Sequence, residues 1–238
     1  MSLCHFHKCR PARSGIRHSA FFILHFAFFL LSASASWAGS NLLINGHFDA
    51  TNEFLRGWKY NYADTGQGMF VSNHIYVAVT NDGSKKHVLS LRIGNRYDTG
   101  VQVDSAPIPF TPGARYTLTA SVKTTKPDCR IQLDGYRWRP GVKPHANPEF
   151  KELRKCYRFT QLYFGAAKGG ITGGISPKMG WTTASQTYPD IKMSKMAQEN
   201  FDKIQFLIVH ILAIYGVYDE NGPDGFLYVD DVELERVR

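Results

Sequence analysis

The sequence lacks the short motifs by which common hydrolases are identified. It contains no Gly-x-Ser-x-Gly nucleophile elbow and no His-Glu-x-x-His zinc motif. It also shows no evident pair of acidic residues for glycoside hydrolysis, which needs two carboxylates about 5 to 9.5 Å apart across a cleft. Catalysis is therefore the less favoured class of function.

The chain also lacks a run of basic residues, although its 238 residues carry a formal charge of +8. The first 38 residues hold no acidic residue, and they hold four basic ones: Lys8, Arg10, Arg13 and Arg17. The remainder of the chain therefore carries a formal charge of +4. A surplus of this size, spread along the sequence, predicts no surface for a polyanion, and we expect no nucleic-acid partner.

Residues 1–38 have the three parts of a secretory signal: a basic stretch, an apolar run and a group of small residues. Cleavage after Ala35 or after Ala38 would satisfy the preference for small residues before the cut. A membrane anchor is the alternative, but a span needs about 20 apolar residues and this run is shorter. We predict a secreted protein, extracellular or periplasmic, whose single domain covers residues 39–238 and has no membrane span after signal cleavage.

Cysteine is scarce outside the leader, where only Cys129 and Cys156 remain. No histidine stands beside them at zinc spacing, so they form no metal site. In an oxidising compartment two thiols can pair, and we expect a Cys129–Cys156 disulfide. Two separate thiols are the alternative that the sequence leaves open.

The mature part consists of short alternating apolar stretches separated by Gly, Pro, Asn and Asp, a pattern typical of an antiparallel β-sandwich. Residues 204–215 are apolar on both faces apart from Gln205 and His210, which predicts a central strand covered on both sides. No carboxylate or nucleophile motif accompanies His210, so we interpret it as a hydrogen-bonded core histidine.

Helix is predicted in two places only, over residues 148–155 and, on weaker signals, over residues 192–200. The glycine- and proline-rich stretch 135–180 is interpreted as a long excursion between strands, of the kind that often carries function. We therefore expect an all-β fold with one or two short helices in its loops.

Four signatures occur in order along this part of the chain. Residues 41–49 read N-L-L-I-N-G-H-F-D and precede a Gly-Trp pair, residues 112–118 read P-G-A-R-Y-T-L, residues 181–188 read W-T-T-A-S-Q-T-Y, and residues 225–234 read G-F-L-Y-V-D-D-V-E-L. Together they resemble carbohydrate-binding modules of families 4 and 9 and their galactose-binding-like jelly-roll relatives. The resemblance implies a jelly-roll sandwich whose first and last segments are strands, with Trp58 and Trp181 as structural residues.

The resemblance also implies a structural calcium ion near both termini, with Asp49 and Asp230 as carboxylate ligands and backbone carbonyls completing the shell. On the last strand, the two-residue period places Phe226, Tyr228, Val232 and Leu234 on one inward face with Asp230 among them. An inward carboxylate must be neutralised. Capping of backbone amides or pairing with an arginine is the alternative to calcium.

A sugar site needs flat apolar faces and polar groups for the sugar hydroxyls. The strand over residues 129–138 predicts an outward row that ends in two aromatic residues, and outward residues of other strands could line the same concave sheet. The candidate binding residues are Arg92, Tyr97, Gln102, Gln132, Tyr136 and Trp138. The alternative is that Tyr136 and Trp138 pack beneath the long loop as a satellite core.

The sequence thus predicts a secreted, monomeric, non-catalytic protein that binds a polysaccharide or oligosaccharide. Two alternatives remain open: a glycoside hydrolase or an accessory subunit of one, since such modules are often attached to these enzymes, and a cell-surface module that binds proteins.

Overall fold

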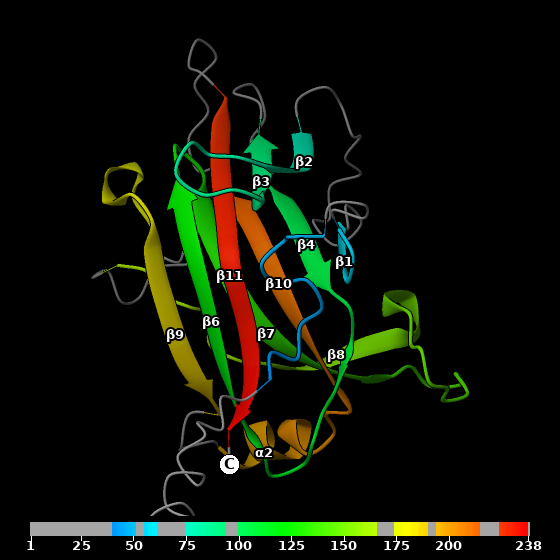
Figure 1. The fold of residues 1–238 in the computed structure, drawn as a ribbon. Coiled ribbons are helices and arrows are strands. Elements are labelled where there is room, and N and C mark those ends of the chain that lie inside the picture. The colour runs from blue at the N-terminus through cyan, green and yellow to red at the C-terminus, as the bar shows by residue number, and fades with distance from the viewer. Residues whose placement is uncertain are drawn as a thin grey trace, which may run out of the picture. The chain divides into compact units, whose positions relative to one another are not determined.

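The computed structural model describes residues 40–50, 55–60, 75–93, 100–165, 174–189, 194–214 and 224–237. Residues Gly39–Arg238 form one compact unit, built from two layers of antiparallel strands (Figure 1). The predicted all-β sandwich is confirmed. The leader and Tyr97 lie outside the described residues.

The first layer, sheet A, has the strand order β1-β4-β10-β7-β8, and the short β5 also pairs with β10. Its strands are β1 (Trp58–Tyr60), β4 (Val101–Ser105), β5 (Ile108–Pro109), β7 (Asp128–Trp138), β8 (Leu153–Arg158) and β10 (Phe206–Ile214).

The second layer, sheet B, has the order β2-β3-β11-β6-β9. Its strands are β2 (Ile75–Thr80), β3 (Val88–Ile93), β6 (Arg115–Thr124), β9 (Thr182–Tyr188) and β11 (Gly225–Val237).

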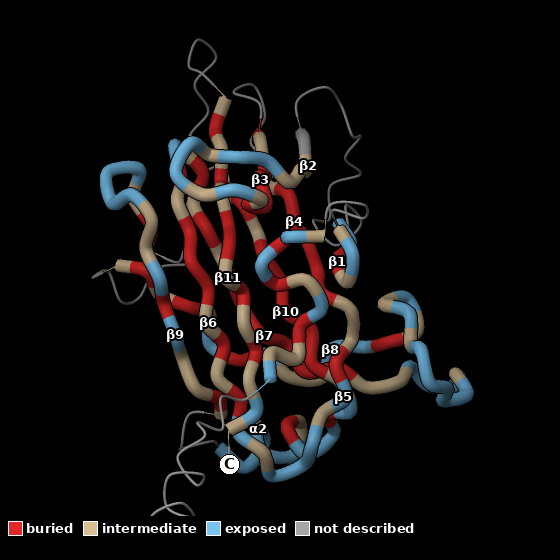
Figure 2. Tube along the Cα trace, viewed as in Figure 1, coloured by how far each residue is buried: buried red, intermediate tan, exposed pale blue. Residues whose placement is uncertain are grey.

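The hydrophobic core lies between the two sheets and follows the alternation of the strands. Leu118, Ala120 and Val122 of β6 face Ile131 and Leu133 of β7 within one cluster of buried side chains, and Figure 2 shows buried residues recurring along each central strand. Each fully buried Leu, Val or Ile contributes roughly 1.5–3 kcal/mol relative to exposure. Burial of this stripe therefore fixes which face of each strand turns inward.

Strand β10 is the central strand that the sequence predicts. It pairs with β4 on one side and with β7 on the other. Its odd-numbered residues, such as Val209 and Ile211, face the inter-sheet core, and Ile208 and His210 are also buried on the opposite face. That opposite face, which points away from sheet B, is called here the outer face of sheet A.

The alternation predicted for the last strand is wrong, because β11 contains a bulge. The register with β6 shifts between Asp230 and Glu233, and Asp231 has a positive φ of 50°. An extra residue inverts the inward face along a strand. Leu227 and Val229 therefore share the core with Val232 and Leu234, whereas Phe226 and Tyr228 are only partly buried.

The loop and helix predictions are partly corrected. The helix expected over 148–155 is a single 3₁₀ turn, η2 (Phe150–Glu152), closed by a capping box between Glu149 and Glu152. Strand β8 follows at once and pairs with β7, so the predicted excursion contains a strand. Helix α2 (Lys195–Phe201) confirms the second helix, and no helix within the described ranges is long and apolar enough to span a membrane.

The segment over residues 41–49 is a series of turns and not the strand implied by the resemblance. It is nevertheless fixed to β11, because Asn41 accepts from the Leu234 amide at 3.0 Å. Phe48 is buried against Trp58 with ring centroids 5.5 Å apart, which confirms a structural role for Trp58.

The predicted disulfide is wrong, since Cys129 and Cys156 are both free thiols. Cys129 points into the core from the start of β7, whereas the Cys156 thiol lies 3.4 Å from the carbonyl of Gly135. Cys129 and Gly135 are six residues apart along β7, which corresponds to about 20 Å. A disulfide requires Cα atoms no more than about 7 Å apart.

Candidate functional site

The strand register assembles a transverse row of polar side chains on the outer face of sheet A. Lys59 pairs with Asp104, Asp104 with His210, and His210 with Gln132. Paired residues on neighbouring strands project to the same side. Four residues that are distant in sequence thus become one row across β1, β4, β10 and β7.

Two residues of this row, His210 and Gln132, line a groove of about 620 Å³. The groove contains three of the predicted binding residues, Gln102, Gln132 and Tyr136, and they come from two different strands. It is lined by Gln102, Arg130, Gln132, Asp134, Tyr136, Arg139, Phe150, Leu153, Arg154, Lys155, Arg158, His210 and Leu212.

The floor of the groove is a buried hydrogen-bond network centred on His210, whose side chain is 3% exposed. Its Nδ1 lies 2.6 Å from Oδ1 of Asp104, and its Nε2 lies 3.1 Å from the Tyr136 hydroxyl and 3.4 Å from Oδ2 of Asp134. A carboxylate oxygen accepts in this contact when Nδ1 carries the ring proton. The amides of Gln102 and Gln132 donate to Asp104 and Asp134, at 2.5 and 3.1 Å.

Asp134 connects this floor to the rim. Its side chain is fully buried, and cations approach it from β8: Lys155 Nζ lies 3.2 Å from Oδ2, and Arg158 Nε lies 3.8 Å from Oδ1. Burial raises the pKa of Asp134, and His210, Lys155 and Arg158 offset only part of that rise. One carboxylate oxygen of each aspartate, Asp104 Oδ2 and Asp134 Oδ1, has no hydrogen-bond donor from the protein.

The prediction that His210 is buried and hydrogen-bonded is confirmed, but the premise that no carboxylate accompanies it is wrong. Asp104 and Asp134 approach it from neighbouring strands. Alternation alone would have placed Asp104 on the same face as Gln102, which is the signal that sequence reasoning missed.

The aromatic row of β7 matches the satellite-core alternative. Tyr136, 4% exposed, packs with Leu153 and Ile208 in a second buried cluster that Trp138 and Phe206 flank. Trp138 contacts Phe206 edge to face at 5.4 Å and is not a lining residue of the groove. Of these two residues, only Tyr136 therefore remains a candidate for ligand contact.

A second depression of about 550 Å³ lies beside the groove on the same face. Phe150 lines both, and its ring lies 5.5 Å from that of Tyr136. The second depression is lined mainly by apolar groups and includes Tyr60, which is 43% exposed. The outer face of sheet A thus offers a polar groove and an adjoining aromatic surface.

Arg92 does not share this face. It lies on β3 in sheet B, where it pairs with β11 and β2, and its guanidinium donates to Asp224 at 2.6 Å. The prediction that Arg92 and Gln102 line one sheet is wrong, because β3 and β4 belong to different layers.

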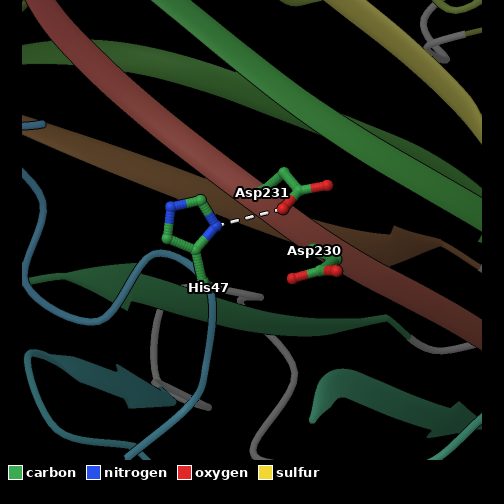
Figure 3. Close-up of side chains that lie close together, drawn as sticks. All are labelled: His47, Asp230 and Asp231. Atoms are coloured by element: carbon green, nitrogen blue, oxygen red, sulfur yellow. Dashed lines mark hydrogen bonds and ion pairs between the residues drawn. The ribbon is translucent and has the colours of Figure 1, made fainter. Parts of the chain in front are cut away.

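The predicted calcium ligands are not brought together. The Asp49 carboxylate is 74% exposed and lies 3.3 Å from His87. Asp230 instead lies with Asp231 and His47, in the one group of three metal-ligating side chains found within the described ranges (Figure 3). The bulge turns both aspartates to one side, although neighbours on a regular strand point to opposite faces.

An ammonium group already stands at these carboxylates. Lys85 Nζ lies 3.0 Å from Asp230 and 2.5 Å from Asp231, which also contacts His47 at 3.0 Å. Burial alone would lower the pKa of Lys85, but hydrogen bonds to the two aspartates raise it. The residues present therefore fit a pair of aspartates bridged by a lysine better than the calcium shell that the resemblance implies.

Trp181 belongs to the cluster around Lys85 and not to the hydrophobic core. Lys85 Nζ lies 4.7 Å from the centre of its ring, and its indole N–H donates to Asp82 at 2.8 Å. Asp82 also accepts from Lys123 at 2.9 Å. The loop between β2 and β3 is thus joined to β6, β9 and β11 by charged hydrogen bonds.

Comparisons with known proteins give likeness in structure only. The chain is similar to a family 11 carbohydrate-binding module from Clostridium thermocellum, solved with a β-1,3-1,4-mixed-linked tetrasaccharide, at 12% identity and a TM-score of 0.43 over 84% of this chain and 97% of that one. A structure described as "CBM4 structure and function" gives 16% and 0.39, covering 82% of this chain and 99% of the other.

The enzymatically active domain of tailspike protein 4 from bacteriophage CBA120 is also similar, at 11% identity and a TM-score of 0.44 over 83% of this chain. The likeness spans about a fifth of that protein, 21% of its chain. No family model matches the sequence, and no curated protein matches it. The site is therefore interpreted from its own residues.

Proposed function

We propose that this protein is exported and binds a carbohydrate chain in the groove on the outer face of sheet A without cleaving it. The observation that carries the proposal is the convergence of amide, guanidinium and phenol groups on one groove, namely Gln102, Gln132, Arg130 and Tyr136. Such groups provide the donors and acceptors that sugar hydroxyls require.

Two features support a saccharide over an apolar ligand. The unpaired oxygens of Asp104 and Asp134 are buried beneath the groove, where ordered water can supply their donors, so the floor is too polar to suit an apolar ligand. The adjoining depression, with Tyr60 and Phe150, offers apolar surface for the C–H face of a sugar ring. A chain that crosses from the groove to the depression would use both.

Glycosyl-bond cleavage is the second candidate, because Asp104 and Asp134 flank one histidine. Their side chains, however, are 5% and 0% exposed and are already bound by Gln102, Gln132 and Lys155. A general acid or base must come within hydrogen-bond reach of the substrate. The present arrangement favours binding.

Affinity electrophoresis against neutral and acidic polysaccharides, run beside a reducing-sugar assay, tests the proposal. Retention without sugar release supports it. Release that disappears in both Asp104→Asn and Asp134→Asn would establish the enzyme instead. No retention on any polysaccharide would overturn carbohydrate binding.

The variant Gln132→Leu tests whether the groove is the binding site, because it removes an amide from the floor. Ser185→Ala is the matched control, since Ser185 is exposed on β9 in sheet B. We expect the first variant to lose retention and the second to keep it. Equal retention by the two variants would place the ligand elsewhere.

A further inference from the structure

The rim of the groove is strongly basic. Five of its thirteen lining residues are Arg or Lys, and one, Asp134, is acidic: the cations are Arg130, Arg139, Arg154, Lys155 and Arg158. All of these cations except the half-buried Arg130 are exposed. The groove therefore has a surplus of four positive charges, as large as the +4 of the whole chain after the leader.

This finding corrects the expectation that the basic residues are too dispersed to attract a polyanion. They are dispersed in sequence, but the pairing of β7 with β8 gathers them around one groove. The surplus remains after the Asp134 carboxylate, which faces Lys155, Arg158 and His210, has been counted. A cleft lined by one sign of charge concentrates ligands of the opposite sign.

Protection of a sheet edge explains only part of the pattern. Lysines and arginines on an edge strand discourage pairing with other chains, and β8 is an edge strand. Arg130, however, comes from β7, which pairs with β10 and β8. Arg139 follows the end of β7, and its Nε donates to the Leu153 carbonyl at 2.9 Å, which holds the guanidinium beside the groove.

The cations are also spaced for an extended ligand. Arg158 pairs with Asp134, four residues along β7 from Arg130. That separation is about 13 Å, given 3.3 Å per residue. A chain with an anionic group on successive sugars can contact both positions at once.

We propose that the ligand of this groove is an acidic polysaccharide that carries carboxylate or sulfate groups at intervals. The inference rests on the proposed function and names its ligand class. The guanidinium groups bind the anionic substituents, since charge-assisted and bidentate hydrogen bonds favour Arg for carboxylate and sulfate. The amides of the floor and the Tyr136 hydroxyl bind the sugar hydroxyls.

The experiment compares ligands that share a sugar backbone and differ in whether it carries anionic groups. Polygalacturonate is compared with its methyl-esterified form, and dextran sulfate with dextran, so that the carboxylate and sulfate sources are separated. Binding is measured by calorimetry at two salt concentrations. We expect the charged member of at least one pair to bind at least tenfold more tightly than its neutral partner, and less tightly at higher salt.

Arg130→Gln and Arg158→Gln should each weaken that binding about tenfold, because each removes a charge-assisted contact. Arg115→Gln is the matched control, an exposed arginine on β6 in sheet B, and should leave affinity unchanged. Equal losses in all three variants would show only a general charge effect and overturn the site.

Three further outcomes separate this inference from the function beneath it. Equal binding of charged and neutral chains, or of neutral chains alone, overturns the acidic ligand and leaves carbohydrate binding intact. Equal binding of polyglutamate or polyadenylate overturns saccharide recognition in favour of a general polyanion site. No binding of any polysaccharide overturns both proposals.

Discussion

The imidazole of His210 makes its shortest contact in the groove floor with Asp104, whose Oδ1 lies 2.6 Å from Nδ1. Both side chains are at most 5% exposed. His210 also approaches Asp134 on its other nitrogen, so it is shared by two buried carboxylates. Removing one member leaves an uncompensated buried charge.

His210→Phe should therefore lower the free energy of unfolding by about 3–5 kcal/mol at pH 7. Urea denaturation measures the loss. The double variant with Asp104→Asn should lose less than the sum of the two single variants, because the phenylalanine no longer faces an ionised partner. Strictly additive losses would show that the two residues do not interact.

Lys85 predicts how the fold responds to calcium. Since its ammonium already contacts both Asp230 and Asp231 where a cation would lie, the melting temperature should not change on adding calcium or a chelator. Lys85→Ala should lower the melting temperature and create a dependence on calcium, because His47 and the two aspartates then remain as ligands. Lys86→Ala, an exposed neighbour, is the control. A calcium-dependent wild type would restore the ion implied by the resemblance.

The free state of the two cysteines can be tested by thiol reactivity in the chain from Gly39 onward. Without reductant, a thiol reagent should titrate two groups in urea, since neither cysteine is bridged. In the folded protein Cys156 should react slowly and Cys129 not at all. Burial raises the pKa of both thiols, and Cys129 is completely enclosed in the core. A protein with no titratable thiol in urea would restore the disulfide.

The layers, the central strand and most strand faces follow from the sequence because they depend on local alternation. Leu118 and Val122 face inward at the positions their spacing predicts. Alternation fails at Asp231, whose left-handed φ adds a residue to β11 and turns two neighbouring carboxylates to one side. A bulge of this kind has no clear signature in a single sequence.

The site was only partly predictable for a different reason. Gln102, Gln132 and Tyr136 follow from their outward positions, but their meeting with Asp104 and His210 depends on which strands are neighbours. Strand β8 was hidden in a glycine-rich stretch, where Gly135 lets Ile204 and Tyr157 approach the β7 backbone. A Cβ atom there would lie 2.6 Å from Ile204. Long-range pairing of this kind is not encoded in local periodicity.

Two substitutions at Tyr136 should separate its contribution to binding from its contribution to stability. Tyr136→Phe keeps the ring in its cluster with Leu153 and Ile208 but removes the hydroxyl that lies 3.1 Å from His210. It should weaken saccharide binding while changing unfolding by about 1 kcal/mol. Tyr136→Ala should destabilise the fold by about 3–5 kcal/mol, since it empties a buried aromatic position. If Tyr136→Phe binds as the wild type does, the hydroxyl is not part of the site.

The contributions of Asp82 and Asp134 to the free energy of unfolding should respond to acid in opposite directions. Burial alone would raise the pKa of Asp82, but the backbone amides of Lys85 and Ser84 and the side chains of Lys123 and Trp181 together lower it. Its ionised form stabilises the fold above the ordinary pKa of aspartate, about 3.9, and that contribution is lost as the pH falls further.

For Asp134 the sign is reversed. Burial raises its pKa in the folded state, so its contribution to stability is complete below about pH 3.9 and is lost as the pH rises through the folded value. The free energy of unfolding, measured by urea at intervals from neutral to acidic pH, separates the two. Asp82→Asn should flatten the loss of stability below about pH 3.9, whereas Asp134→Asn should alter only the slope above it. The slope of the free energy of unfolding against pH is compared because each substitution also removes contacts, which shift the whole curve. Identical slopes in wild type and Asp82→Asn would show that the carboxylate of Asp82 does not connect the β2–β3 loop to β6 and β9.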